Sequence, residues 1–210
     1  MDPLHSPSTP GTGAARPEIL DALRQRVARL PAGLRDHVFR VEAEARRLAE
    51  IYGLDPERLL LAVLGHDLYR AHGPKQLLSM AAVLIGPPDP VEEAEPILLH
   101  GPLGALAMQV QFGIDDAEAL DAARYHTTGR PGMTLLEKAL FLADKIEPEK
   151  VNGVPELQEV RRLAEHDPDE AILRYLDYQV RRSTELGWLL HPHLVAARNE
   201  LLRRQRQHTP

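Results

Sequence analysis

The 210-residue chain contains no cysteine, which excludes disulfide bonds and thiolate chemistry. Aromatic residues make up only 4% of the sequence, so aliphatic side chains must fill the core. The longest apolar run, at about residues 59–64, is far too short to span a bilayer. The N-terminal stretch also lacks the apolar segment of a secretory signal. We therefore expect a cytoplasmic protein with no membrane partner.

An excess of positive charge is also missing. Aspartate and glutamate outnumber lysine and arginine by 31 to 25, and the formal net charge is −6. A general nucleic-acid binder needs a basic face, so no nucleic-acid partner is expected. A small polyanionic ligand stays compatible with this balance if cations are gathered locally or supplied as metal ions.

The apolar positions favour helices. Leucine and alanine dominate them, whereas valine, isoleucine and threonine are too thinly spread for a large sheet. Apolar periodicity and capping signals predict one all-α domain over residues 17–206, after a disordered tail at residues 1–16. The pattern indicates many short helices and not a four-helix up-and-down bundle. The predicted helices cover about residues 17–30, 34–52, 56–68, 75–85, 102–112, 115–125, 134–146, 155–165, 168–186 and 192–204. Capping-box spacing marks the start of two of them, with Asp115 paired to Glu118 and Thr134 paired to Glu137.

Four histidines and two aspartates occupy inward or helix-end positions in this pattern. Each alone has an ordinary explanation, such as a hydrogen-bonded core histidine or an aspartate paired with a neighbouring lysine. Together they form a nitrogen and oxygen ligand shell, which suits Fe, Mn, Co, Ni or Zn better than Mg or Ca. Six ligands exceed the need of one tetrahedral ion and suit two divalent ions that share a carboxylate. The six residues are His37, His66, Asp67, His100, His126 and Asp144.

The order of these residues resembles the H…HD…D signature of the HD-domain metallophosphohydrolases. Longer strings resemble the YqeK family of bacterial HD-domain proteins, and they lie at residues 98–105, 124–148 and 191–199. This likeness covers about residues 34–199. It implies a single HD-domain-like multi-helix domain that hydrolyses diadenosine tetraphosphate symmetrically to two ADP. Two divalent ions would activate the water, and iron is the metal that the resemblance implies.

The resemblance also assigns roles to individual residues. His37, His66, Asp67 and Asp144 would hold the first ion, while His100 and His126 would complete the second with Asp67 as the bridge. Asp67, Arg130 and Lys145 would be catalytic. The residues expected to meet the substrate phosphates are Arg70, Thr127, Thr128, Gly129 and Arg130. Two departures from the family pattern are Gly65, where leucine is usual, and Arg70, where lysine is usual.

Two other functions stay open at this point. One is another HD-type nucleotide phosphohydrolase or phosphodiesterase, acting on a nucleoside monophosphate, a nucleoside triphosphate or a cyclic dinucleotide. The other is a non-catalytic helical protein that keeps a metal or nucleotide for stability or sensing. A small nucleotide is the expected partner, and the sequence leaves a homodimer open. Trp188 and Tyr175 are expected to serve core or lid packing rather than base stacking.

Overall fold

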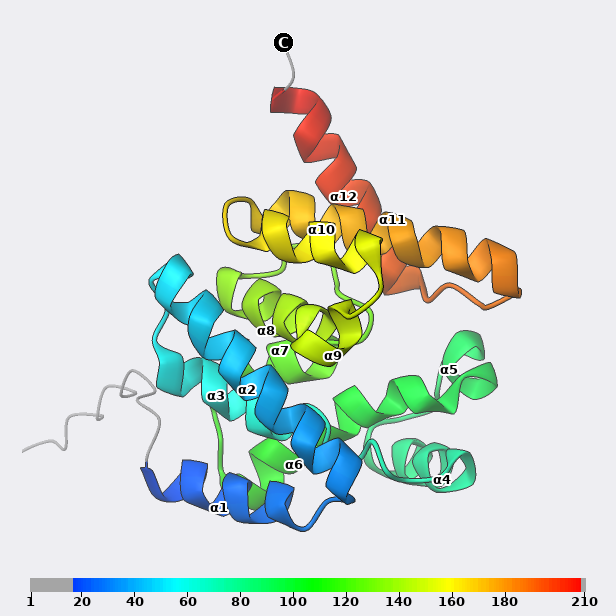
Figure 1. The fold of residues 1–210 in the computed structure, drawn as a ribbon. Coiled ribbons are helices and arrows are strands. Elements are labelled where there is room, and N and C mark those ends of the chain that lie inside the picture. The colour runs from blue at the N-terminus through cyan, green and yellow to red at the C-terminus, as the bar shows by residue number, and fades with distance from the viewer. Residues whose placement is uncertain (1–16, 209–210) are drawn as a thin grey trace, which may run out of the picture.

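The computed structural model describes residues 17–208, and every regular element within that range is a helix (Figure 1). This confirms the all-α prediction, while the tail predicted at residues 1–16 lies outside the described residues. The elements are α1 (Pro17–Ala28), α2 (Ala32–Tyr52), α3 (Pro56–Gly65), α4 (Pro74–Leu84), α5 (Pro90–Ala94), the 3₁₀ turn η1 (Pro96–Leu99), α6 (His100–Phe112), α7 (Ala117–Tyr125), α8 (Leu135–Ile146), α9 (Pro148–Val151), α10 (Pro155–Ala164), α11 (Pro168–Leu186) and α12 (Pro192–His208).

All ten predicted helices are present, with ends shifted by a few residues. The helix expected to reach Leu68 stops at Gly65, so the next residues form a turn. Asp116 caps α7 by accepting from two backbone N–H groups, so the cap predicted at Asp115 is wrong. The capping box predicted at Thr134 is confirmed. Three short elements, α5, η1 and α9, were not predicted.

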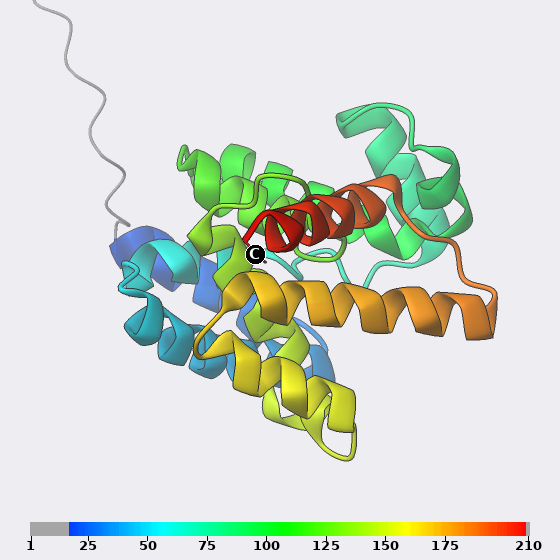
Figure 2. The same cartoon turned by 90° about the horizontal axis from the view of Figure 1, so that it is seen from above.

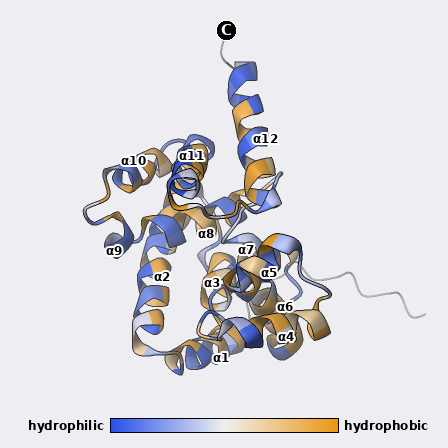
Figure 3. Ribbon diagram, turned by 90° about the vertical axis from the view of Figure 1, so that its right-hand side faces the viewer, coloured by the Kyte–Doolittle hydropathy of each residue, from blue (hydrophilic) through white to orange (hydrophobic). Residues whose placement is uncertain are grey.

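Helix α8 is the centre of the fold. Nearly all of its residues are buried, and α2, α3, α7, α10 and α11 pack around it. Helix α3 is buried in the same way from Leu59 to Gly65. Helix α12 projects beyond the rest of the described chain (Figure 3). No helix among residues 17–208 is long and apolar enough to cross a bilayer.

Two glycines bring α6 into backbone contact with its neighbours. A Cβ atom on Gly104 would lie 2.8 Å from the carbonyl oxygen of Gly65, and one on Gly101 would lie 2.8 Å from that of Arg124. Only glycine permits these approaches without displacement. They hold the start of α6 against the ends of α3 and α7. Gly65, the departure from the usual leucine, leaves space that the Met108 side chain occupies.

Helices α4 and α5 form a separate projection at one side, joined to α6 through η1 and a small apolar cluster (Figure 2). The linker at residues 187–191 turns back from the end of α11 towards this projection, where α12 begins (Figure 2). His191 in the linker contacts Asp89, which caps α5, at 3.1 Å. The linker therefore connects the α11 end of the molecule with the α4–α5 projection.

Candidate metal centre

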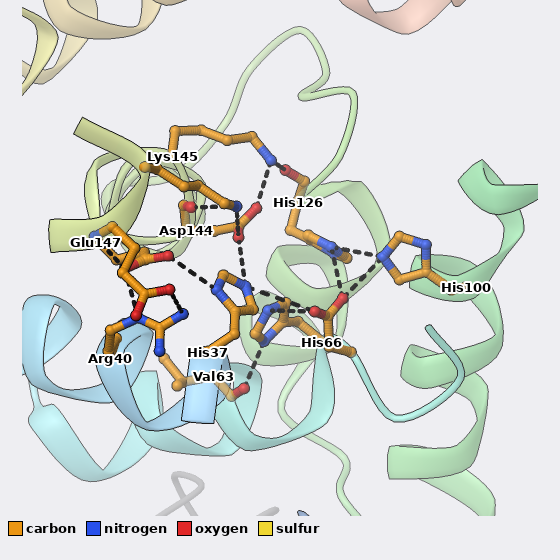
Figure 4. A network of polar contacts seen from close by, with 12 residues as sticks. His37, Arg40, Val63, His66, His100, His126, Asp144, Lys145 and Glu147 are labelled. Atoms are coloured by element: carbon orange, nitrogen blue, oxygen red, sulfur yellow. Dashed lines mark hydrogen bonds and ion pairs between the residues drawn. The ribbon is translucent and has the colours of Figure 1, made fainter. Parts of the chain in front are cut away.

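The predicted metal ligands converge on one cluster of polar side chains (Figure 4). They come from α2, from the turn after α3, from the start of α6 and from the ends of α7 and α8. All are buried except His37, whose side chain is 14% exposed. Two groups of mutually close donor atoms overlap in the cluster: His37, His66 and Asp67 form one, and Asp67, His100 and His126 form the other.

Asp67 is common to both groups because its two oxygens face different imidazoles. Oδ1 lies 3.0 Å from Nε2 of His100 and 3.6 Å from Nε2 of His126. Oδ2 lies 3.5 Å from Nε2 of His66 and 3.7 Å from Nε2 of His37. This is the arrangement expected of a carboxylate that bridges two adjacent cations.

Three of the four histidines direct Nδ1 to the backbone carbonyl three residues earlier, at the end of a helix. The ends of α3 and α7 leave such carbonyls without a helical partner, whereas the carbonyl of Ile97 also accepts from the backbone N–H of His100. A carbonyl only accepts, so Nδ1 must carry the proton and Nε2 must present its lone pair to the cluster. The Nε2 atom of His66 is buried and has no hydrogen-bond partner in the described part of the chain, which fits a metal ligand. The three pairs are His66 with Val63 at 2.6 Å, His126 with Ala123 at 2.8 Å, and His100 with Ile97.

His37 is oriented differently, by a carboxylate that the sequence pattern does not reveal. Its Nδ1 atom lies 3.3 Å from Oε1 of Glu147, which is buried. The other oxygen of Glu147 accepts from Nε of Arg40 at 2.8 Å. A carboxylate behind a ligating histidine fixes the ring and raises its basicity. The only local signal for Glu147 was its place before Pro148, where it caps α9.

The electrostatics of the cluster favour charged carboxylates and neutral rings. Burial opposes ionisation of Asp67, but the surrounding histidines outweigh it and hold its pKa well below the usual value. Burial also lowers the pKa of His66, and it lowers the pKa of His126 to about 3. Anionic carboxylates beside neutral imidazoles are the forms that ligate divalent cations. The donor set therefore fits such ions.

Asp144 joins the cluster from the end of α8. Its Oδ1 atom lies 3.1 Å from Nε2 of His37. Lys145 donates to Oδ2 at 2.5 Å and to the carbonyl oxygen of His126 at 3.0 Å, while Lys150 donates to Oδ1 at 2.7 Å. Burial opposes the charge on Asp144, but these two lysines and His37 hold its pKa well below the usual range. Lys150 was not among the predicted site residues.

A cleft of about 830 Å³ opens over the cluster, within the size range of ligand pockets. Its lining includes both lysines as well as Arg70, which is exposed, and Thr127. Aromatic side chains from α11 and the following linker form another part of the wall. Trp188 is half exposed there, whereas Tyr175 is buried and packs edge-on against Phe141.

The remaining predicted phosphate contacts lie elsewhere. Arg130 is held by Glu137 through two hydrogen bonds of 2.7 Å and by Asp121 at 3.3 Å, and it does not line the cleft. Thr128 is buried and donates to the carbonyl oxygen of Gly129, which has a φ of 65°. The structure thus brings Thr127, Lys145 and Arg70 to the cleft and supports structural roles for the other three residues.

Comparisons with known proteins agree with this geometry. Residues 34–149, more than half of the chain, match the HD domain family. The chain is 40% identical over 138 residues to a symmetrical bis(5'-nucleosyl)-tetraphosphatase of Bacillus subtilis (strain 168), covering 66% of this chain and 73% of that protein. It is 34% identical over 170 residues to a protein of the same description from Halalkalibacterium halodurans. This match covers 81% of this chain and 89% of that protein.

A solved structure is also similar. It is the crystal structure of a protein from Clostridium acetobutylicum described as a predicted HD superfamily hydrolase involved in NAD metabolism. The two structures superpose with a TM-score of 0.82 at 31% sequence identity. The similarity covers 88% of this chain and 97% of the other.

Proposed function

The chain belongs to the HD domain family, with symmetrical bis(5'-nucleosyl)-tetraphosphatases among its relatives, and on that basis we propose that it hydrolyses diadenosine tetraphosphate to two ADP. The resemblance drawn from the sequence is confirmed, and the chain is a hydrolase of the metal-dependent HD type. The observation that carries the proposal is the sharing of Asp67 between two groups of histidines beneath a cleft of ligand size.

Two divalent ions are the cofactors that we infer. His37, His66, Asp67 and Asp144 would hold one, and Asp67, His100 and His126 the other. When bound, such ions lower the pKa of a coordinated water and offset negative charge on phosphoryl oxygens. Iron is the metal we propose, although Mn, Co, Ni or Zn also suit imidazole-rich sites.

The cleft supplies positive charge for a tetraphosphate. Lys145 and Lys150 line the cleft, and their ammonium groups donate hydrogen bonds to the carboxylate of Asp144. Arg70 adds an exposed guanidinium to the lining. These cations are positioned before the substrate arrives, so they can stabilise charge on the phosphoryl oxygens with little reorganisation. Thr127 offers a hydroxyl beside them. Arg130 is omitted from the proposed contacts because it does not line the cleft and its guanidinium is held away from it by Glu137 and Asp121.

The leaving group needs little assistance from a general acid. ADP is stable as an anion, so cleavage at the centre of the tetraphosphate does not require a strong general acid. Binding and orientation are therefore the main tasks of the side chains around the ions. A cytoplasmic location and a homodimer stay predictions.

Product analysis tests the proposal. The purified protein, loaded with Fe(II) or Mn(II), is incubated with diadenosine tetraphosphate, and the nucleotides are separated by anion-exchange chromatography. ADP is the expected product. Formation of ATP and AMP would contradict symmetrical cleavage. Preferred turnover of a nucleoside monophosphate, a nucleoside triphosphate or a cyclic dinucleotide would indicate another HD phosphohydrolase. Metal binding without turnover of any of them would indicate a binding protein.

A further inference from the structure

A second pocket, of about 290 Å³, lies beside the cleft over the metal centre. The loop before α5, the end of α7 and the start of α12 contribute to it. Leu98 and Thr127 line both this pocket and the cleft. The two spaces are therefore neighbours on either side of Thr127, the residue after the ligand His126.

The walls of the second pocket suit a nucleoside. Tyr125 and His193 line the pocket with aromatic rings that meet edge to face, with their centroids 5.3 Å apart, and Arg130 lies over the Tyr125 ring. Ile85 adds apolar surface. Arg124 lines the pocket, and its buried Nε has no hydrogen-bond partner among residues 17–208, since Oδ1 of Asp121 is 4.0 Å away. Aromatic rings bind a base through its π-face, and a free donor can serve its polar edge or a sugar hydroxyl.

One segment of chain reaches both spaces. In the linker at residues 187–191, Trp188 lines the cleft, whereas His191 lines the second pocket and contacts Asp89 at 3.1 Å. The linker runs from the end of α11 to the α4–α5 projection (Figure 2). A ligand with two arms could therefore contact this linker at both ends while its centre lies near the metal ligands.

The second pocket is poorly suited to a metal ion, although Asp89, Glu92 and His191 bring donor atoms close together there. Nδ1 of His191 accepts from the backbone N–H of His193 at 3.1 Å. In the neutral ring, Nε2 must then carry the proton and donate to Asp89. No lone pair of His191 is left for a cation, so we assign this contact to the wall of the pocket.

The chemistry of the proposed substrate requires binding elements away from the metal centre. The central and flanking phosphoanhydrides of a dinucleoside tetraphosphate are alike, so ions alone do not select between them. The same ions would also accept the phosphates of a nucleoside triphosphate. Binding of remote groups is what positions one bond for reaction and separates such substrates.

We propose that the second pocket binds one nucleoside of the dinucleotide, while the other nucleoside lies in the cleft beside Tyr178 and Trp188. This inference rests on the proposed function. The tetraphosphate would pass Thr127 between them. The pocket would then distinguish a two-nucleoside substrate from nucleotides with a single nucleoside.

The test compares a two-nucleoside with a one-nucleoside ligand. KM is measured for diadenosine tetraphosphate, and adenosine 5'-tetraphosphate is titrated as a competitor to give its inhibition constant. Ile85→Trp fills the second pocket. A single nucleoside can use the unobstructed cleft, whereas the dinucleotide needs both spaces. The variant should raise KM about tenfold more than it raises the inhibition constant, the scale of one lost stacking contact.

His193→Ala provides the same test if Ile85→Trp does not fold, because it removes a ring without adding volume. His166→Ala, an exposed histidine after α10, is the matched control. Equal changes in both constants would overturn the second nucleoside pocket while leaving the proposed function intact. Absence of hydrolysis by the unaltered protein would instead remove the proposed function, and the pocket assignment with it.

Discussion

Nε2 of His100 lies 3.0 Å from Nε2 of His126 in the buried cluster. Both rings have Nδ1 on a backbone carbonyl, so in their neutral forms two lone pairs face each other. Burial lowers the pKa of His126 to about 3, so its protonation does not relieve this repulsion at neutral pH. A cation between the two rings and Asp67 would relieve it, and this contact is our strongest argument for an ion in the second group.

The first prediction concerns the shared ligand. Asp67→Ala should remove both ions and abolish turnover, because both ions would lose the carboxylate that they share, and Asp144 can serve only the first group. Elemental analysis of the purified protein gives ions per chain, and Asp36→Ala, an exposed aspartate beside His37, is the control. A variant that keeps one tightly bound ion would contradict the bridging role.

A second prediction concerns the carboxylate behind His37. Glu147→Gln should weaken the ion held by His37 and His66 by about 10–100-fold, the usual effect of losing such a partner. The ion at His100 and His126 should stay bound. Competition with a chelator of known affinity measures both. The control is Glu149→Gln, since Glu149 also pairs with Arg40 but is largely exposed and has no contact with His37 among those described. Equal weakening in the two variants would contradict the positioning role.

A third prediction follows from the close packing of α6. Gly101→Ala places a Cβ atom 2.8 Å from the carbonyl oxygen of Arg124 and 3.3 Å from Nδ1 of His126. It should cost roughly 1–3 kcal/mol of unfolding free energy and displace the second ion. Gly33→Ala is the matched control, because a Cβ atom there meets no atom of the described residues within 4 Å. Chemical denaturation and ion content check both variants, and similar behaviour of the two would contradict the packing argument.

A fourth prediction separates structure from catalysis at Arg130. Arg130→Ala leaves the carboxylate of Glu137, which is 2% exposed, without its bidentate partner. Stability should fall by roughly 2–4 kcal/mol, while kcat/KM of the folded variant changes little. Urea unfolding and steady-state kinetics provide the two measurements. A large loss of kcat at unchanged stability would restore Arg130 as a phosphate contact.

The fifth prediction is a pH dependence of stability away from the metal centre. Burial opposes the charge on Asp116, but hydrogen bonds from Arg58 and from the start of α7 hold its pKa below the usual value. Because the pKa of Asp116 is lower in the folded state, its ionised carboxylate stabilises the fold above the unfolded-state pKa of about 4. This stabilisation is lost as the pH falls through the folded-state pKa. Asp116→Asn keeps a capping side chain and removes the ion pair.

The cost of Asp116→Asn should therefore be roughly 1–2 kcal/mol at pH 7 and should shrink below about pH 4. Denaturant unfolding of both proteins from pH 7 to pH 3 measures this difference. Asp115→Asn, at the exposed neighbouring position, should show no such trend. A difference that stays constant with pH would contradict the assignment of the ion pair.

The sequence predicts helices well where glycine or proline marks an end, and less well where burial continues past it. Leu68 is 2% exposed, so apolar spacing extends the predicted third helix beyond Gly65, although the backbone has already turned. Spacing reports burial and not hydrogen bonding. This error concealed the turn that directs His66 and Asp67 towards the cluster.

The metal ligands could be predicted because histidine and aspartate in such positions have few uses, and because their order resembles a known family. Glu147 could not, since its contact with His37 joins residues 110 apart in the sequence. Arg130 shows a different limit. Glu137 was correctly predicted in a capping box, but its Oε1 atom also accepts from Arg130, and local patterns do not reveal this second partner.

Three of the four imidazoles take their orientation from the last turn of a preceding helical segment and not from distant side chains. Helix ends fray more easily than helix centres. Ion binding would therefore tie together the most labile backbone of α3, η1 and α7. Amide hydrogen exchange at these ends should slow when metal is added, whereas exchange in the middle of α8 should follow global unfolding.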